Sequence, residues 1–340
     1  MFQHRVPGGV PGGVPGGSSC ISCGSLPGPL QLQPVSSEGL GHQSISIRNL
    51  SKRYGDLVAV KKLDLDVSEG EVLGFLGLNG AGKSTTIRIL LDLLRPTSGH
   101  AAIFGHDCQK EGLVARAMTG YLPGEMGVYS DLTGTAVLDL LAGLNNGKVS
   151  RQYRSELQER LELPDPDLSR KLREYSTGMK RKLGLIQAFQ ADPRLLILDE
   201  PTEGLDPLMQ ESFYELVAQV RRRGRTVFMS SHVLSEVERV CDRIALLRKG
   251  ELVLLSTVEE IRRLAPRRVH VYFDQDVMSP PQLPVGHEAV EVKPRIWRLR
   301  IEGLLGPLMA MLSGLPVRDL EVEEPRLEDV LITYYKGTGE

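Results

Sequence analysis

The spacing of apolar residues predicts alternating strands and helices from residue 45 onward. Apolar and polar residues alternate over 45–50 and 58–67, which predicts two short antiparallel strands. Residues 72–76 form an almost continuous apolar run typical of a buried strand. Over 83–95 apolar residues recur at helical spacing, which predicts a helix that ends near Pro96.

The middle of the chain continues the alternation. Residues 132–183 are mostly helical by spacing, and 195–198 is a continuous apolar run of the kind found in parallel strands covered on both faces. Strands predicted at 226–229 and 244–247 each follow a predicted helix. Alternation of this kind indicates a layered α/β domain with a parallel sheet.

A smaller α+β domain is predicted over 265–340, where the pattern restarts with shorter elements. The domain limits expected from the sequence are therefore 45–264 and 265–340, preceded by a segment over 1–44. The elements expected in the small domain are strands at 269–273, 297–301 and 320–322 and helices at 304–312 and 327–335.

Residues 1–44 contain three Val-Pro-Gly-Gly repeats and are rich in Ser, Pro and Gly, so they are expected to be disordered. The four cysteines are too few and too scattered for a disulfide framework, which favours a reducing compartment. Cys20 and Cys23 have zinc-ligand spacing, but no second pair completes a tetrahedral site. No secretory signal and no apolar run near 20 residues long is apparent.

Charge is nearly balanced, with 41 basic and 43 acidic residues. A balanced chain has no general attraction for nucleic acid or anionic membrane, so no nucleic-acid partner is expected. The run 221–223 of three arginines is interpreted as a solvated helix end beside a turn at Gly224.

The candidate chemistry starts in a glycine-rich loop between the strand at 72–76 and the following helix. This phosphate loop, residues 77–84, matches the pattern G-x-x-x-x-G-K-[ST] in the strand–loop–helix context that the pattern requires. Glycines let backbone N–H groups converge on phosphate oxygens, and the start of the helix adds its positive end. The residues expected to bind nucleotide phosphates and Mg²⁺ are Gly77, Asn79, Gly80, Ala81, Gly82, Lys83, Ser84 and Thr85, with Ser84 on the metal.

Two acids, Asp199 and Glu200, close the apolar strand at 195–198. Here one carboxylate can reach Mg²⁺ and its neighbour can polarise water. Acids that end a buried strand also often only cap the next helix, so this pair is informative only together with the phosphate loop.

Taken in order, the motifs resemble the ATP-binding subunit of an ABC transporter over about 45–258. They are the phosphate loop with Thr85, Tyr175-Ser176-Thr177-Gly178-Met179, Leu198-Asp199-Glu200-Pro201, Gly204-Leu205-Asp206-Pro207, and Ser231-His232. Val330, Tyr334 and Tyr335 also resemble the tail of ABC-2-type exporter ATPases. The resemblance implies a RecA-like P-loop NTPase core with an antiparallel β subdomain and a helical subdomain.

The resemblance also implies residue roles. Asp199 positions Mg²⁺, Glu200 is the general base, and His232 contacts the γ-phosphate; a helix-capping role is the alternative for His232. Tyr54 stacks on adenine, or is an ordinary strand aromatic. Ser176 and Gly178 reach the γ-phosphate of a second cassette, and Asp206 links the two sites.

This chain departs from the family pattern at two places. Gly124 and Glu125 follow Tyr-Leu-Pro where the family has glutamine, so Glu125 is the candidate sensor of metal and partner. Thr177 and Met179 replace the usual glycine and glutamine, while Ser176 and Gly178 remain.

The resemblance implies the ATP-hydrolysing subunit of an ABC-2-type exporter, in which ATP closes two cassettes, expected to be a homodimer, and drives a separate polytopic permease. The subunit itself is expected to be peripheral, at the cytoplasmic face of the membrane. Met126, Val128 and Tyr129 are candidates either for the permease contact or for the core. The alternatives are an ABC ATPase that works without a membrane partner, and a regulatory subunit that does not hydrolyse ATP.

Overall fold

The computed structural model describes residues 42–125, 130–144, 149–324 and 326–336. The expectations for the N-terminal repeats, for Cys20 and Cys23, and for Met126, Val128 and Tyr129 concern residues outside these ranges. None of the helices within them combines the length and apolar character that crossing a bilayer requires.

A six-stranded, largely parallel sheet with the order β10-β9-β3-β8-β7-β6 forms the centre of the layered α/β region expected over 45–264. Neighbouring pairs among β9, β3, β8, β7 and β6 run parallel, and β10 pairs antiparallel with β9. Every residue of β3, β7 and β8 is buried, as expected for strands covered on both faces. The bounds are β3 Val72–Leu76, β6 Thr119–Leu122, β7 Leu195–Asp199, β8 Thr226–Ser231, β9 Arg243–Arg248 and β10 Glu251–Thr257.

A second sheet, with the order β2-β1-β4-β5, is antiparallel and contributes to a core with one face of the six-stranded sheet. The two strands expected from alternation are confirmed, but β1 and β2 each extend over 12 residues. β1 begins before the apolar pattern does, because the buried hydroxyl of Ser44 donates to Val67 O at 3.0 Å. The bounds are β1 Gln43–Tyr54, β2 Leu57–Ser68, β4 Ser98–Ile103 and β5 His106–Asp107.

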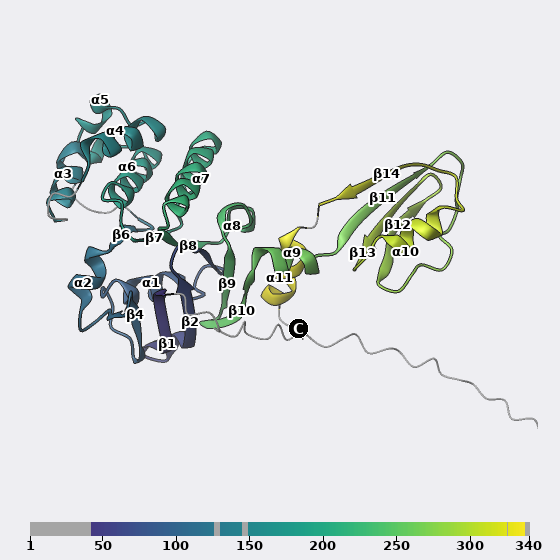
Figure 1. Ribbon diagram of the computed structural model, residues 1–340, viewed down its shortest axis with the longest axis horizontal. Helices are drawn as coiled ribbons and strands as arrows, with labels where there is room; N and C mark the ends of the chain where they lie inside the picture. The colour runs from purple at the N-terminus through teal and green to yellow at the C-terminus, as the bar shows by residue number, and fades with distance from the viewer. Residues whose placement is uncertain (1–41, 126–129, 145–148, 325, 337–340) are drawn as a thin grey trace, which may run out of the picture. The chain divides into compact units, whose positions relative to one another are not determined.

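Helices pack on the opposite face of the six-stranded sheet, where they share a core with β3, β7 and β8 (Figure 1). The expectation of mostly helical structure over 132–183 is confirmed for the described residues. The helices here are α3 Gly134–Leu144, α4 Arg151–Arg160, α5 Asp165–Leu168, a 3-10 turn at Leu172–Glu174, α6 Thr177–Phe189, α7 Pro207–Arg222 and α8 Leu234–Val240.

Two helices precede this group in the chain, α1 Lys83–Leu90 and α2 Gly112–Ala117. The prediction that the first of them reaches nearly to Pro96 is wrong. Asp92 has a left-handed backbone with φ 57°, and both Leu93 N and Leu94 N donate to Arg88 O, which ends the helix.

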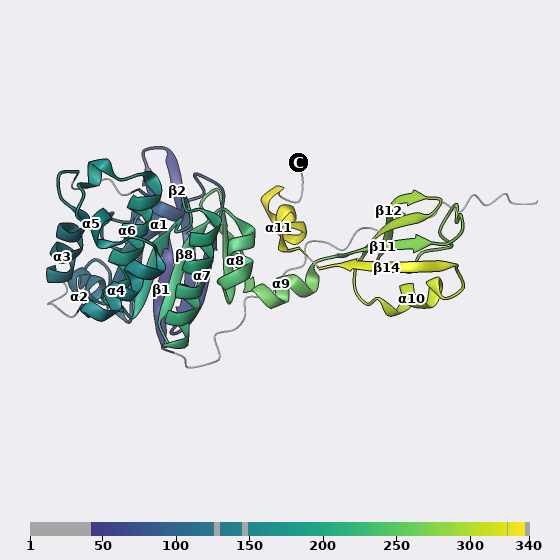
Figure 2. The ribbon, with the colours of Figure 1, turned by 90° about the horizontal axis from the view of Figure 1, so that it is seen from above.

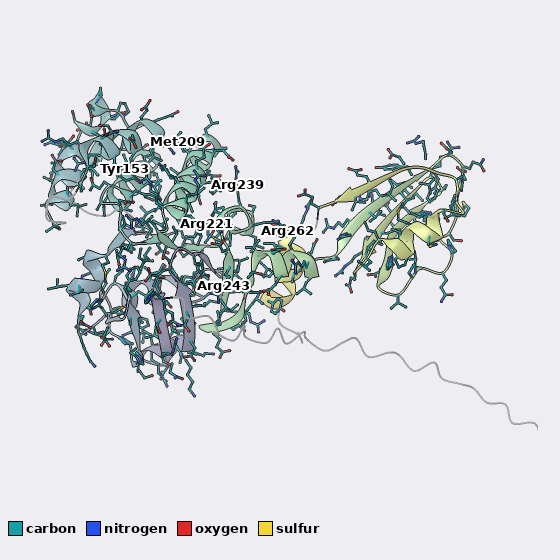
Figure 3. The ribbon with its side chains drawn as sticks, in the orientation of Figure 1. Tyr153, Met209, Arg221, Arg239, Arg243 and Arg262 are labelled. Atoms are coloured by element: carbon teal, nitrogen blue, oxygen red, sulfur yellow. The ribbon has the colours of Figure 1, made fainter. Side chains whose placement is uncertain are left out.

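The three arginines at the end of α7 are beside a turn at Gly224, where φ is 74°. Arg221, which Figure 3 labels together with Tyr153, forms an ion pair with Asp242. The guanidinium carbon of Arg223 lies 5.1 Å from the ring centre of Tyr153. The helix end is exposed as expected, but two of its side chains also connect α7 to neighbouring elements.

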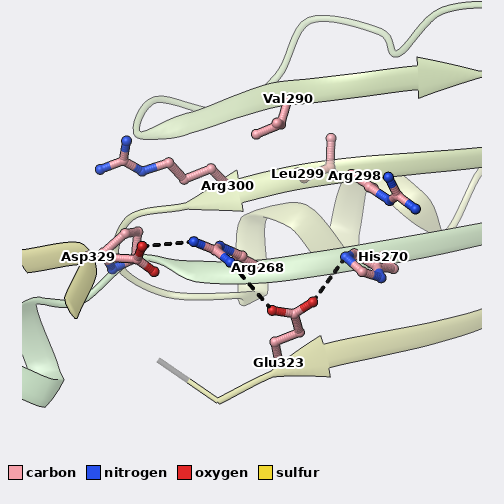
Figure 4. A pocket seen from close by; sticks show the side chains of 9 residues that line it. Arg268, His270, Val290, Arg298, Leu299, Arg300, Glu323 and Asp329 are labelled. Carbon is pink, nitrogen blue, oxygen red and sulfur yellow. Dashed lines mark hydrogen bonds and ion pairs between the residues drawn. The ribbon is translucent and has the colours of Figure 1, made fainter. Parts of the chain in front are cut away.

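The third sheet, with the order β12-β13-β11-β14, buries one face against α10 (Figure 2). On its other face Arg268 contacts Asp329 at 2.7 Å and Glu323 at 3.9 Å, and His270 lies 3.3 Å from Glu323 (Figure 4). Arg268 and His270 on this face are therefore paired with acids of the same chain. The bounds are β11 Arg267–Phe273, β12 His287–Lys293, β13 Ile296–Ile301, α10 Gly306–Leu312 and β14 Val317–Glu323.

The last helix, α11 (Leu327–Lys336), packs against α8 and α9 (Val258–Leu264) of the cassette. Leu327 and Leu331 are buried in the same core as Val237 and Ile261. Arg248 also donates to Tyr334 O at 2.8 Å. The chain after the third sheet therefore returns to the cassette, which its position in the sequence does not reveal.

Candidate functional site

The carboxyl ends of the buried parallel strands converge on one edge of the sheet. β3 pairs with β8 so that Leu76 lies opposite Ser231, and β7 pairs with β8 so that Asp199 lies opposite Ser230. Ligands of open α/β sheets bind at this edge, in the crevice beyond the strand ends. The phosphate loop, the two acids and His232 all follow these strand ends directly.

The backbone of the phosphate loop requires glycine at two places. A Cβ at Gly82, where φ is 110°, would lie 2.5 Å from Ala59 O, and one at Gly77 would lie 2.7 Å from Leu247 O. The loop is thus confined between β2 and β9, while Gly80, where φ is 80°, has no atom within 4 Å of an added Cβ. The open side of the loop is the side on which a ligand can approach.

Lys83, the first residue of α1, turns its side chain inward and is only 6% exposed. Its Nζ donates to Gly77 O at 2.6 Å and lies 3.2 Å from Glu200 Oε1. A buried ammonium needs such partners, because removing an unpaired charge from water costs several kcal/mol. The lysine is therefore held where the loop and the acids meet.

Both acids at the end of β7 are held by hydrogen bonds to groups on β8 and just after it. Ser230 Oγ donates to Asp199 Oδ1 at 2.5 Å and accepts from Glu200 N at 3.1 Å. Glu200 Oε2 lies 2.8 Å from His232 Nδ1. Glu200 has a left-handed backbone, φ 49°, a conformation that costs a non-glycine residue about 1 kcal/mol or more. Lys83, Glu200 and His232 therefore form one connected set.

The other predicted phosphate-loop residues follow the same turn. Asn79 and Gly80 are exposed and Ala81 is buried, with Ala81 N donating to Leu78 O at 3.0 Å. Ser84 is exposed and Thr85 half-buried on the first turn of α1.

The remaining predicted site residues lie on other elements. Tyr54 is half-exposed at the end of β1, with Lys52 Nζ 5.1 Å from its ring centre. Ser176 caps α6 by accepting from Met179 N at 3.1 Å, and Asp206 caps α7 by accepting from Met209 N at 3.1 Å.

A cleft of about 670 Å³ joins several of these groups, and Glu125 is exposed on its lining. The structure thus brings Glu125 and Thr177 to the same cleft as Ser84 and the two acids. Gly178 packs beside the turn before α7, where a Cβ on it would lie 3.2 Å from Gly204 O. The cleft is lined by Ser84, Arg88, Tyr121, Pro123, Gly124, Glu125, Thr177, Lys180, Arg181, Asp199, Glu200 and Glu203.

Two buried charged residues near the site were missed by the sequence reasoning. Glu236 of α8 is 7% exposed and accepts from Ser231 Oγ at 2.8 Å and from Thr202 Oγ1. It therefore joins the segment before His232 to the segment after Glu200. Arg181 of α6 is 6% exposed and bonds to loops on both sides of the cleft. No motif marks either residue, since each acts through partners that are distant in sequence.

Comparisons with known proteins agree with this geometry. The family model described as ABC transporter matches residues 60–203. The daunorubicin resistance ATP-binding protein of Streptomyces coeruleorubidus is 32% identical over 300 residues, which cover 85% of this chain and 95% of that protein. This chain belongs to the ABC transporter ATP-binding family. Its members are ATPases whose hydrolysis of ATP powers transport, and the chain is an ATP-binding subunit of this type.

Further comparisons support the same assignment. An ABC transporter ATP-binding protein of Nostoc is 40% identical over 208 residues, and this chain spans 62% of its length. A solved ATP-binding subunit of an ABC transporter superimposes with a TM-score of 0.60 at 31% identity, covering 64% of this chain and 92% of that one. The P-loop NTPase fold expected from the resemblance is therefore confirmed.

The phosphate loop of this cassette fits ATP. The loop is confined on the sides of Ala59 and Leu247 and open at Gly80, so backbone N–H groups can approach phosphate oxygens without side-chain interference. Lys83 supplies a buried positive charge at the same place. ATP supplies the phosphoanhydride that is hydrolysed, and the chain supplies the groups that hold it.

Proposed function

We propose that this cassette belongs to an exporter and drives a separate membrane permease through ATP hydrolysis. The observation that carries the proposal is the connected set of Lys83, Glu200 and His232 at one sheet edge, with Glu200 within 3.2 Å of the lysine and 2.8 Å of the histidine. Export rather than import is supported by the similarity to a daunorubicin resistance protein. The proposed location is the cytoplasmic face of the membrane, as a peripheral subunit.

Glu200 is the proposed general base and His232 the group that orients it. The carboxylate is 16% exposed and fixed at both oxygens, so its direction is set before substrate binds. A positioned base of this kind contributes on the order of 10²–10⁴-fold to a rate. Lys83 is the proposed phosphate contact, and Tyr54 the proposed adenine contact.

Mg²⁺ is the proposed metal, held by Asp199 and Ser84. Within the described residues, no group of three or more His, Cys, Asp or Glu side chains could hold a metal ion. Mg²⁺ is commonly bound by one or two protein ligands together with substrate phosphates, and the pair present here fits that mode. Glu125, on the lining of the same cleft, is the proposed sensor of the metal.

The cassette is proposed to work as a dimer in which Ser176 and Gly178 of one copy face the nucleotide of the other. Support comes from the exposure of Ser176 and Thr177 at the start of α6, where the helix presents backbone N–H groups toward solvent. Asp206, also exposed, is the proposed link between the two sites. The domain limits at 44 and 264 remain predictions, with α11 packing on the cassette.

ATPase assays of wild type and Glu200→Gln test the hydrolytic role. We expect the variant to lose at least about 100-fold in kcat, because the amide cannot accept the proton. Glu203→Gln is the matched control, since it removes one negative charge from the same cleft and should keep most of the activity. Equal, near-zero rates in wild type and Glu200→Gln would instead indicate a regulatory subunit.

Affinity purification from a detergent extract tests the membrane role. We expect a polytopic membrane protein to co-purify with the cassette in stoichiometric amount. Recovery of ATPase activity without any such protein, from both membrane and soluble fractions, would contradict the transport role and favour an ABC ATPase without a membrane partner.

A further inference from the structure

Arg181 is a buried cation whose guanidinium is surrounded by backbone carbonyls. It lies on α6, five residues after Ser176, and is 6% exposed. Burial of a guanidinium is costly unless its N–H groups are paired. Here burial lowers the pKa of Arg181, while the carboxylates of Glu203, Asp199 and Glu200 act to raise it. The hydrogen bonds of its guanidinium therefore offset the cost of its burial.

The donors of Arg181 bind two separate loops. Nη1 donates to Pro123 O at 2.9 Å and Nη2 to Gly124 O at 2.8 Å, both in the loop after β6. Nε donates to Glu203 O at 3.1 Å, in the turn after β7. A planar guanidinium offers these donors in a fixed arrangement, which a lysine cannot reproduce.

Each loop is directly connected to one of the acids. A Cβ on Gly124 would lie 3.4 Å from Asp199 Oδ2, so the loop after β6 lies beside that carboxylate. Glu203 N donates to Glu200 O at 3.2 Å, so the turn after β7 begins at the proposed base. Arg181 thus bonds to the backbone beside both acids, and its own helix is the one that Ser176 caps.

We propose that Arg181 is a positioning residue that fixes residues 123–125 and 200–203 to α6. This inference rests on the proposed function, because it assigns Arg181 the task of holding Asp199, Glu200 and Glu125 in one geometry. Through this residue, a movement of α6 is transmitted to the acids. All three guanidinium nitrogens of Arg181 donate to backbone oxygens, so its role in this proposal is positioning rather than catalytic.

The test compares Arg181→Met, Arg181→Lys and Lys182→Met. Methionine matches the length of the apolar stem and leaves three carbonyls without their donor. Lysine keeps the positive charge but lacks the planar arrangement of donors that the guanidinium provides. Lys182→Met is the control, because Lys182 lies on the same helix, is 14% exposed, and pairs with Glu162 at 3.8 Å. Hydrogen exchange of residues 119–125 and 200–205, ATPase kcat and KM, and Tm are measured for each.

For Arg181→Met we expect faster exchange in both segments and a kcat that falls on the order of 10- to 100-fold, with a smaller change in KM, since misplaced catalytic groups lower the rate of the chemical step. Arg181→Lys should recover part of both effects, and Lys182→Met should show neither. If Arg181→Met does not fold, Arg181→Gln provides the same comparison.

Exchange in both segments equal to that of Lys182→Met would overturn the inference, as would faster exchange with an unchanged kcat. Absence of ATPase activity in the wild type would count against the proposed function alone. The exchange comparison on the nucleotide-free protein would still decide whether Arg181 holds the two segments.

Discussion

Gly82→Ala tests how tightly the phosphate loop is confined. The backbone at Gly82 has φ 110°, and the new methyl group would lie 2.5 Å from Ala59 O and 3.4 Å from Val60 Cγ2. Holding an alanine in such a conformation costs about 1–3 kcal/mol, and overpacking against a neighbouring strand costs about 1–3 kcal/mol more. We expect a loss of about 2–6 kcal/mol in the free energy of unfolding, the sum of these two ranges.

Gly80→Ala is the matched control within the same loop. Gly80 has φ 80°, but an added Cβ meets no atom within 4 Å, so only the conformational cost of about 1–2 kcal/mol applies. Urea unfolding without nucleotide, with the slope m compared across variants, measures both losses. Equal losses in the two variants, or a loss below about 1 kcal/mol for Gly82→Ala, would refute the close approach of Ala59 to the loop.

Three further predictions concern groups away from the phosphate loop. Burial raises the pKa of Cys108 from 9.0 to about 12. The stability contributed by its neutral thiol is therefore present below pH 9 and lost as the pH rises toward 12. In a variant without the two N-terminal cysteines, iodoacetamide at pH 8 should modify Cys108 only after unfolding. Thr202→Val removes the hydroxyl that donates to the buried carboxylate of Glu236. We expect the free energy of unfolding, measured in urea, to fall by about 1–3 kcal/mol. An unchanged midpoint would contradict the hydrogen bond. Leu331→Ala should lower the free energy of unfolding by about 2–5 kcal/mol, measured by thermal unfolding, because Leu331 is buried. Ile332 is exposed, so Ile332→Ala should lower it by less than about 0.5 kcal/mol. Similar Tm values for the two variants would contradict the packing of α11.

The parts of the fold that the sequence predicted well are those buried on both faces. β3, β7 and β8 appear as continuous apolar runs because each is covered by other elements on both sides. Their ends carry the motifs, so the meeting of the phosphate loop, Asp199 and Glu200 could be anticipated from the sequence.

The elements that were missed carry weak patterns. β6 is a four-residue edge strand with only Leu122 buried, and β12 exposes Val290 and Val292, so neither shows clear alternation. α11 carries buried leucines, yet nothing in their spacing tells that they pack against α8 and α9. Arg181 could not be identified because its partners are backbone carbonyls that are distant in sequence. The separations are 22 positions for Glu203, 58 for Pro123 and 57 for Gly124.

We propose that ATP joins two copies of this cassette. Glu200→Gln is expected to slow hydrolysis and leaves the phosphate loop unchanged, so light scattering after gel filtration in Mg²⁺ and ATP can detect the ATP-bound dimer. We predict the mass of a dimer in Mg²⁺ and ATP, and the mass of a monomer in ADP. A variant that stays monomeric in Mg²⁺ and ATP, both alone and with its co-purified membrane protein, would contradict the account.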